Sequence, residues 1–235
     1  MRQFKLFILG IVASASTLFG VDETQLVDLK ISVLLWKQFQ VVAFEENNSL
    51  QPKEVESDLL LYYQDAEEML PLKLMKGQKT KPFIYSGPQK LMLYTQKKGS
   101  DGRLEYQPHL DISLDAGTTE VLLLIVESDQ RSLIKSLDLS GQALEPGHLL
   151  FLNMTDQPIA LKLGGSDPQP IKKFEQIRLQ LAAEPLVQTV TIAAYDEDAW
   201  SVVYRRRMVL KADQRFVGFF SNEGDARNLL LLRDL

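Results

Sequence analysis

The sequence predicts an all-β protein made of β-sandwich units. Short runs of alternating or β-branched residues recur along the 235 residues, and turn-forming residues separate them. Long stretches with the 3.6-residue period of a helix are scarce. An internal repeat, described below, indicates that the same β-rich unit occurs twice. These observations favour packed sheets over alternating βαβ units.

The first element is a predicted signal peptide over residues 1–20. Arg2 and Lys5 precede an apolar run, and Ala13-Ser14-Ala15 supplies the small residues that signal peptidase requires. The apolar stretch 6–21 has only 16 residues, whereas a spanning helix needs about 20. Cleavage is therefore favoured over a retained anchor. We expect an exported protein, periplasmic or extracellular, with no membrane span after signal cleavage.

The strands are predicted where apolar and β-branched residues form short runs. Segment 26–46 also fits one face of a helix, but the alternation of Leu29, Ile31 and Val33 favours strands. Turns are expected between the runs, for example at Ser86-Gly87-Pro88 and Gly164-Gly165. The predicted strands are 29–35, 39–44, 59–63, 70–74, 91–94, 110–114, 121–126, 149–152, 159–163, 177–181, 187–194, 201–210, 216–220 and 229–232.

The internal repeat predicts the domain organisation. Residues 114–139 align without a gap on 210–235, at an offset of 96, with nine of 26 pairs identical. About two identities are expected by chance at ordinary residue usage. Leu72-Lys73-Leu74 also matches Leu161-Lys162-Leu163, at an offset of 89. We therefore predict one β-sandwich over 21–139 and a second over 140–235, each of immunoglobulin-like size and strand number.

Composition excludes several classes of chemistry. The chain has no Cys and two His, so thiolate metal sites, a cysteine nucleophile and multi-histidine sites are excluded. Without Arg2 and Lys5, 24 of the 26 basic residues remain against 31 acidic ones, a net charge of −7. A field of that sign repels nucleic acid. We expect no cofactor, no metal and no nucleic-acid partner.

Catalytic motifs are weak. His109 and His148 each precede a predicted strand, and no Gly-x-Ser-x-Gly elbow accompanies either. A hydrolase would need a pocket that brings one of them close to a carboxylate and a hydroxyl. Asp196-Glu197-Asp198 offers oxygen ligands but lacks the spacing of a calcium loop. We therefore favour a non-catalytic protein, with no catalytic residue assigned.

Aromatic residues are the remaining candidates for a ligand site. Tyr195 and Trp200 flank the acidic tip and are predicted to form a stacking platform for a sugar ring or a peptide. Arg205-Arg206-Arg207 lies in a strand-like run, where alternate side chains point to opposite faces, and is interpreted as a solvated strand. Asn153-Met154-Thr155 fits a glycosylation acceptor. Gly218 is interpreted as a place where a neighbour approaches the strand closely.

A signal peptide followed by two related β-rich units resembles uncharacterised families of exported bacterial proteins with tandem immunoglobulin-like modules. That resemblance implies an exported, non-catalytic protein that acts by surface contact, structural or protein-binding, on a protein or glycan of the cell envelope. A carbohydrate-binding module pair is an alternative. Periplasmic pilus chaperones also have two such domains, but their Arg-containing and Pro-Pro-containing motifs are not found here. A periplasmic assembly chaperone and a hydrolase stay as further alternatives.

Overall fold

A computed structural model describes residues 26–37, 60–100, 102–127, 133–196, 198–223 and 226–234. These residues form sixteen strands and no helix, which confirms the prediction of an all-β protein. In this part of the chain, no helix is long and apolar enough to cross a bilayer. The signal segment and the strand predicted over 39–44 lie outside the described residues.

The strands fall into two groups of eight along the chain. The first half contains β1 (Leu26–Lys37), β2 (Leu61–Asp65), β3 (Glu68–Leu72), β4 (Phe83–Pro88), β5 (Lys90–Lys98), β6 (Leu104–Ser113), β7 (Glu120–Glu127) and β8 (Leu133–Asp138). The second half contains β9 (His148–Asn153), β10 (Ile159–Leu163), β11 (Gln169–Ile171), β12 (Gln176–Gln180), β13 (Val187–Asp196), β14 (Ala199–Val209), β15 (Arg215–Glu223) and β16 (Ala226–Asp234).

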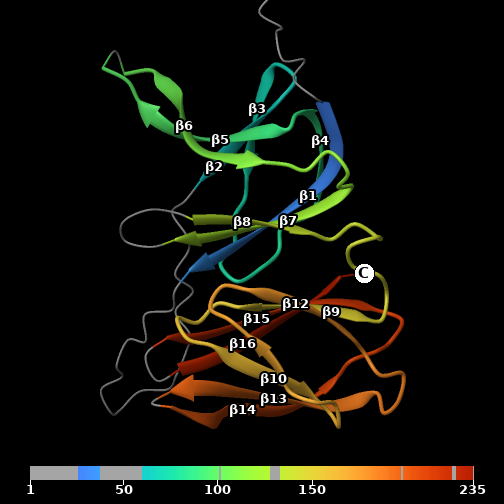
Figure 1. Ribbon diagram of the computed structural model, residues 1–235. Coiled ribbons are helices and arrows are strands. Elements are labelled where there is room, and N and C mark those ends of the chain that lie inside the picture. The colour runs from blue at the N-terminus through green and yellow to red at the C-terminus, as the bar shows by residue number, and fades with distance from the viewer. Residues whose placement is uncertain are drawn as a thin grey trace, which may run out of the picture.

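These strands form four sheets that lie one above another (Figure 1). The orders are β3-β2-β5-β6, β4-β1-β7-β8, β12-β9-β15-β16 and β11-β10-β13-β14. One hydrophobic core cluster fills each of the three spaces between neighbouring sheets. The two halves therefore share a core instead of meeting through polar surfaces.

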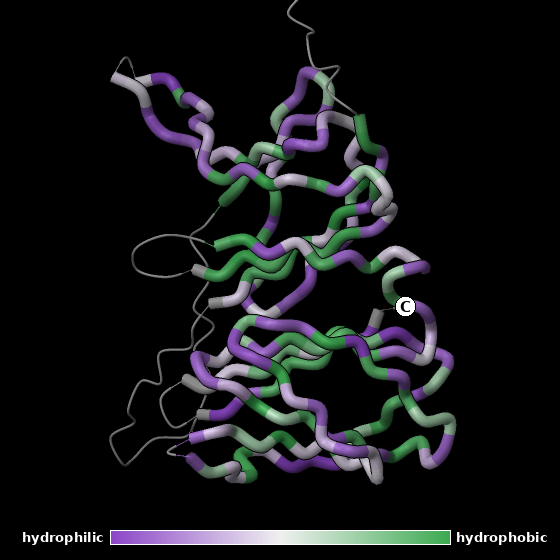
Figure 2. Tube along the Cα trace, viewed as in Figure 1, coloured by the Kyte–Doolittle hydropathy of each residue, from purple (hydrophilic) through white to green (hydrophobic). Residues whose placement is uncertain are grey.

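Strand β7 shows how the middle sheets differ from ordinary sandwich sheets. Val121, Leu123 and Ile125 face the core within the first half, whereas Leu122 and Leu124 face the second half. Because both faces are buried, the strand reads as a continuous apolar run rather than as an alternation. Figure 2 shows the hydrophobic stretches that result in the middle layers.

The strand pairing of the first half recurs in the second half. In the middle sheets, β1 runs parallel to β7 and β9 runs parallel to β15, and the flanking strands β4, β8, β12 and β16 correspond. In the outer sheets, β5–β6 and β13–β14 each contain a register shift, after Leu93 and after Ile192. Corresponding strands can therefore be assigned from the pairing alone.

The register corrects the repeat alignment made from sequence. At the offset of 96, Val121 would match Val217, yet Val121 faces the core of its own half and Val217 faces the core between the halves. The hairpins superimpose at an offset of 95, because Val121 pairs with Asp138 as Phe216 pairs with Arg233. The match at an offset of 89 is wrong too, since β2 corresponds to β10. When a strand is apolar on both faces, an alignment error of one residue leaves the apolar pattern unchanged and cannot be detected from the sequence.

The segment Ser86-Gly87-Pro88, predicted as a turn, is the end of strand β4. An edge strand tolerates proline because one row of its N–H groups needs no partner. Gly87 is required there for a different reason: a Cβ would lie 2.7 Å from the Tyr85 hydroxyl oxygen, which donates a hydrogen bond to the Pro88 carbonyl. Strands β8 and β11 were also not predicted from the sequence.

The acceptor-like triplet at Asn153 is structural. Asn153 is fully buried, and its amide nitrogen reaches the carbonyls of Gln157 (2.9 Å), Ile171 (3.3 Å) and Lys172 (3.1 Å). Its side-chain oxygen accepts hydrogen bonds from the backbone and hydroxyl of Thr155. The side chain therefore ties the end of β9 to the end of β11, and no glycan can be attached to it in the folded protein.

An ion-pair network joins the halves beside the shared core. Arg215 donates to Glu120 Oε2 (3.1 Å) and to the Leu139 carbonyl (2.8 Å), and Lys30 donates to Glu120 Oε1 (2.7 Å). Burial alone would raise the pKa of Glu120, but the hydrogen bonds from Lys30 and Arg215 and their charges outweigh it. The pKa of Glu120 therefore lies below its ordinary value.

Candidate functional site

The hairpin of β13 and β14 places Tyr195 and Trp200 side by side. They are directly opposite across the two strands, with ring centroids 5.2 Å apart and planes tilted by 54°. Tyr195 is 38% exposed and Trp200 49% exposed. The turn residue Asp198 has a φ of 68° and accepts a long hydrogen bond, 3.5 Å, from the Tyr195 hydroxyl. The two residues selected from the sequence thus lie together on the surface; their role in binding stays a prediction.

A β-bulge aligns these rings with two arginines. Trp200 and Arg205 are an odd number of residues apart, so in a regular strand they would point to opposite faces. The register shift between Ile192 and Ala193 leaves Val203 as the extra residue of β14. Trp200, Val202, Arg205 and Arg207 consequently share the outward face of the outermost sheet.

Strand β10 adds a third cation to this face. Lys162 lies between the inward-facing Leu161 and Leu163, so it points outward, and it pairs with Thr191, which in turn pairs with Arg205. Arg207 lies opposite Thr189. Within the described residues, none of the three cations has an ion-pair partner. We call Lys162, Tyr195, Trp200, Val202, Arg205 and Arg207 the outer basic face.

The corresponding face of the first half has different chemistry. By strand correspondence, Tyr106 occupies the place of Trp200, Gln96 that of Tyr195 and Asp111 that of Arg205. Asp111 forms an exposed ion pair with Lys90 at 2.8 Å, and a hydrogen bond and the charge of Lys90 lower the pKa of Asp111. Tyr106 is 40% exposed and packs edge-on against Tyr62 at 5.0 Å. The unpaired cations are thus a property of the second half.

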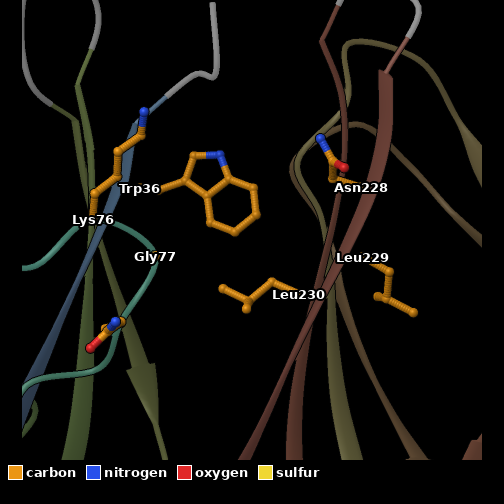
Figure 3. A pocket seen from close by; sticks show the side chains of 7 residues that line it. Trp36, Lys76, Gly77, Asn228, Leu229 and Leu230 are labelled. Atoms are coloured by element: carbon orange, nitrogen blue, oxygen red, sulfur yellow. The ribbon is translucent and has the colours of Figure 1, made fainter. Parts of the chain in front are cut away.

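A groove of about 390 Å³ opens between the halves (Figure 3). Its residues come from the end of β1, the segment after β3, and β16: Trp36, Lys76, Gly77, Gln78, Asn228, Leu229 and Leu230. Figure 3 shows the Trp36 ring in the gap, with Leu230 across from it and Leu229 pointing away. Trp36 is only 4% exposed, and its ring centroid lies 5.7 Å from that of Phe219. Its side chain therefore packs in the core between the halves.

A second cavity of about 350 Å³ lies at one end of the second half. Leu163, Gly164 and Gln188 contribute to it, together with the acidic residues Asp167 and Glu184. The lining of neither cavity contains a histidine.

The structure keeps the two histidines apart. His109 is exposed and is the extra residue of the bulge in β6. His148 is half-buried at the start of β9, and its Nδ1 atom is buried without a hydrogen-bond partner. In the described part of the chain, no group of three or more His, Cys, Asp or Glu residues is placed to hold a metal ion.

Neither a protein-family model nor a curated protein matches this chain. The described residues define the class: an all-β protein of four stacked sheets that has an exposed aromatic and cationic face. Sequence reasoning identified Tyr195 and Trp200 but missed their association with Lys162, Arg205 and Arg207. Only the bulge and the strand order bring these five residues together.

Proposed function

We propose that the protein is an exported, non-catalytic binding protein that acts by surface contact in the cell envelope or outside the cell. The single observation that supports this most is the exposed Tyr195–Trp200 pair beside cations that form no ion pair with any other described residue. Exposed aromatic and arginine side chains contribute most to binding when a rigid support holds them. The buried residues Val190, Ile192 and Ala194 on the inner side of β13 provide that support.

We further propose that the chain folds as two sandwiches, over 21–139 and 140–235. The repeated strand pairing and the separate core cluster within each half support this division. The immunoglobulin-like comparison rests on size and two-layer packing. The strand orders of the first half, β3-β2-β5-β6 and β4-β1-β7-β8, differ from the ABED and CFG orders of an immunoglobulin domain.

The comparison of corresponding residues in the two halves argues against a pair of carbohydrate-binding modules. A module pair would carry similar ligand sites in both halves, yet Gln96 and Asp111 replace Tyr195 and Arg205 in the first half. We therefore assign the contact surface to the second half alone, and regard the first half as its structural partner.

The proposal is tested by cosedimentation of the mature protein with envelope fragments from the organism that encodes it. We expect the Tyr195→Ala/Trp200→Ala variant to lose about tenfold in affinity, because exposed aromatic anchors dominate such contacts. Tyr106→Ala is the matched control, since it removes the corresponding ring from the other half and should leave affinity within about twofold. Circular dichroism establishes that each variant is folded. Unchanged sedimentation of the folded double variant would overturn the proposal.

A further inference from the structure

We infer that the outer basic face binds an acidic polysaccharide, a glycan chain that carries uronic-acid carboxylates. This inference rests on the proposed function and names its ligand class. Two exposed rings lie at the hairpin tip, and the cations follow further along the same sheet face. An elongated ligand that contacts both would need apolar ring surfaces as well as negative charges.

The charge of the outer basic face favours a ligand with negative groups. The chain has a formal net charge of −5, whereas this sheet face carries three cations that have no ion-pair partner in the described part of the chain. They are a local excess of positive charge against the overall negative field. At the place of Arg205, the first half instead has Asp111 in an ion pair with Lys90. Guanidinium groups recognise carboxylates through paired N–H donors, which makes Arg205 and Arg207 suitable for uronates.

The positions of the cations on the sheet favour an elongated ligand. Arg205 and Arg207 are two residues apart on one strand, which separates their Cα atoms by about 6.6 Å. Lys162 lies in the same row as Arg205, two strands away. Thr191 lies between Lys162 and Arg205, and Thr189 lies beside Arg207. Both threonines have hydroxyls that donate and accept hydrogen bonds, as sugar hydroxyls require. This row of side chains along the strands fits an extended chain better than a compact ligand.

Nucleic-acid bases also stack on aromatic rings, but the charge density of a nucleic-acid duplex is too high for this face. Duplex nucleic acid carries about one charge per 1.7 Å, and proteins that bind it neutralise many phosphates. Three cations on a chain of net charge −5 can neutralise few phosphates. A uronate polymer has one charge per acidic sugar, which matches a sparse set of cations. The aspartate at the tip, Asp198, also disfavours a dense polyanion beside Tyr195.

The test compares Arg205→Gln/Arg207→Gln with Arg206→Gln in isothermal titration against polygalacturonate. Arg206 pairs with the inward-facing Val190, so it lies on the opposite face of the same strand and controls for loss of charge. We expect the double variant to bind about tenfold more weakly, whereas Arg206→Gln changes affinity by less than about twofold. Fully methyl-esterified polygalacturonate, which has the same backbone without the charge, should bind as weakly as the double variant binds the acidic polymer.

Several outcomes overturn the inference: no binding of polygalacturonate, equal binding of the methyl ester, or an equal loss in Arg206→Gln. Tighter binding of dextran sulfate or single-stranded DNA would also overturn it, because the face would then select polyanions without regard to carboxylates. The envelope assay keeps the two proposals distinct. If envelope binding depends on Tyr195 and Trp200 while polygalacturonate does not bind, the contact surface stands and only the ligand class is wrong.

Discussion

At the residue scale, Asn153 shows how one buried amide can determine local structure. Three backbone carbonyls and Thr155 all depend on its side chain. Asn153→Ala removes these hydrogen bonds. The Thr155 N–H and the carbonyls of Ile171 and Lys172 then lose a partner, whereas the Gln157 carbonyl keeps the hydrogen bond from the Thr155 hydroxyl. We expect the free energy of unfolding to fall by about 2–4 kcal/mol, measured by urea denaturation, because each unsatisfied buried group is costly.

Gln157→Ala is the appropriate control for Asn153. Gln157 contributes its backbone carbonyl to the network, and the substitution retains that carbonyl. Its effect should remain within about 0.5 kcal/mol. If Asn153→Ala were as mild as Gln157→Ala, the amide would not be what holds β9 and β11 together.

At the element scale, strand β15 depends on a glycine in its middle. A Cβ at Gly218 would lie 2.8 Å from Cδ2 of Phe151, the residue opposite it in β9, and Phe151 is fully buried. Gly218→Ala should therefore lower the free energy of unfolding by about 1–3 kcal/mol through overpacking. The close approach predicted from the sequence is thus made by a side chain of the same chain.

A double-mutant cycle measures this contact. Gly218→Ala combined with Phe151→Leu should be less destabilised than the sum of the single variants, because the smaller side chain makes room for the methyl group. Gly165→Ala, where a new Cβ meets nothing within 4 Å, should have little effect. Additive losses in the cycle would contradict the packing explanation.

The strands that sequence patterns could locate are those with apolar periodicity. The predicted strand 159–163 coincides with β10, and β13 and β14 agree to within a few residues. Strand β4 could not be predicted because its signal is dominated by Gly87 and Pro88, which act through an edge position and a close ring contact. The register of the repeat could not be predicted from β7 for the opposite reason. Leucines occupy both odd and even positions of this strand, so the sequence does not indicate which face points inward.

Only the aromatic pair at the hairpin could be predicted from the sequence of the candidate site. Tyr195 and Trp200 flank a short polar turn, and a hairpin places such residues opposite each other. Relating Trp200 to Arg205 requires the bulge at Val203, and relating Lys162 to Arg205 requires the order β10-β13-β14. Neither follows from spacing along the chain.

At the scale of the whole molecule, the halves pack through corresponding faces. Glu120 and Arg215 occupy corresponding positions at the offset of 95, and they contact each other across the junction. Leu122 and Val217, related by the same offset, both lie in the shared core. Contact between corresponding residues is the property of an isologous, twofold-related interface.

The Glu120–Arg215 pair makes this junction sensitive to pH. Because the pKa of Glu120 is lowered in the folded protein, its contribution to stability is present above the ordinary glutamate pKa, 4.5, and is lost as pH falls through the folded value. Glu120→Gln should therefore lower the free energy of unfolding by about 1–2 kcal/mol at pH 7. The difference in free energy of unfolding between Glu120→Gln and the wild-type protein should shrink progressively as the pH falls below 4.5.

Denaturant titrations at several pH values measure this difference, and Asp111→Asn is the matched control. Asp111 also has a lowered pKa, but its ion pair with Lys90 is exposed to solvent and lies on an outer sheet, away from the junction. Solvent screens such a pair, so its removal should have little effect at any pH. Equal, pH-independent losses in both variants would show that the Glu120 carboxylate is not what links the stability of the two halves to pH.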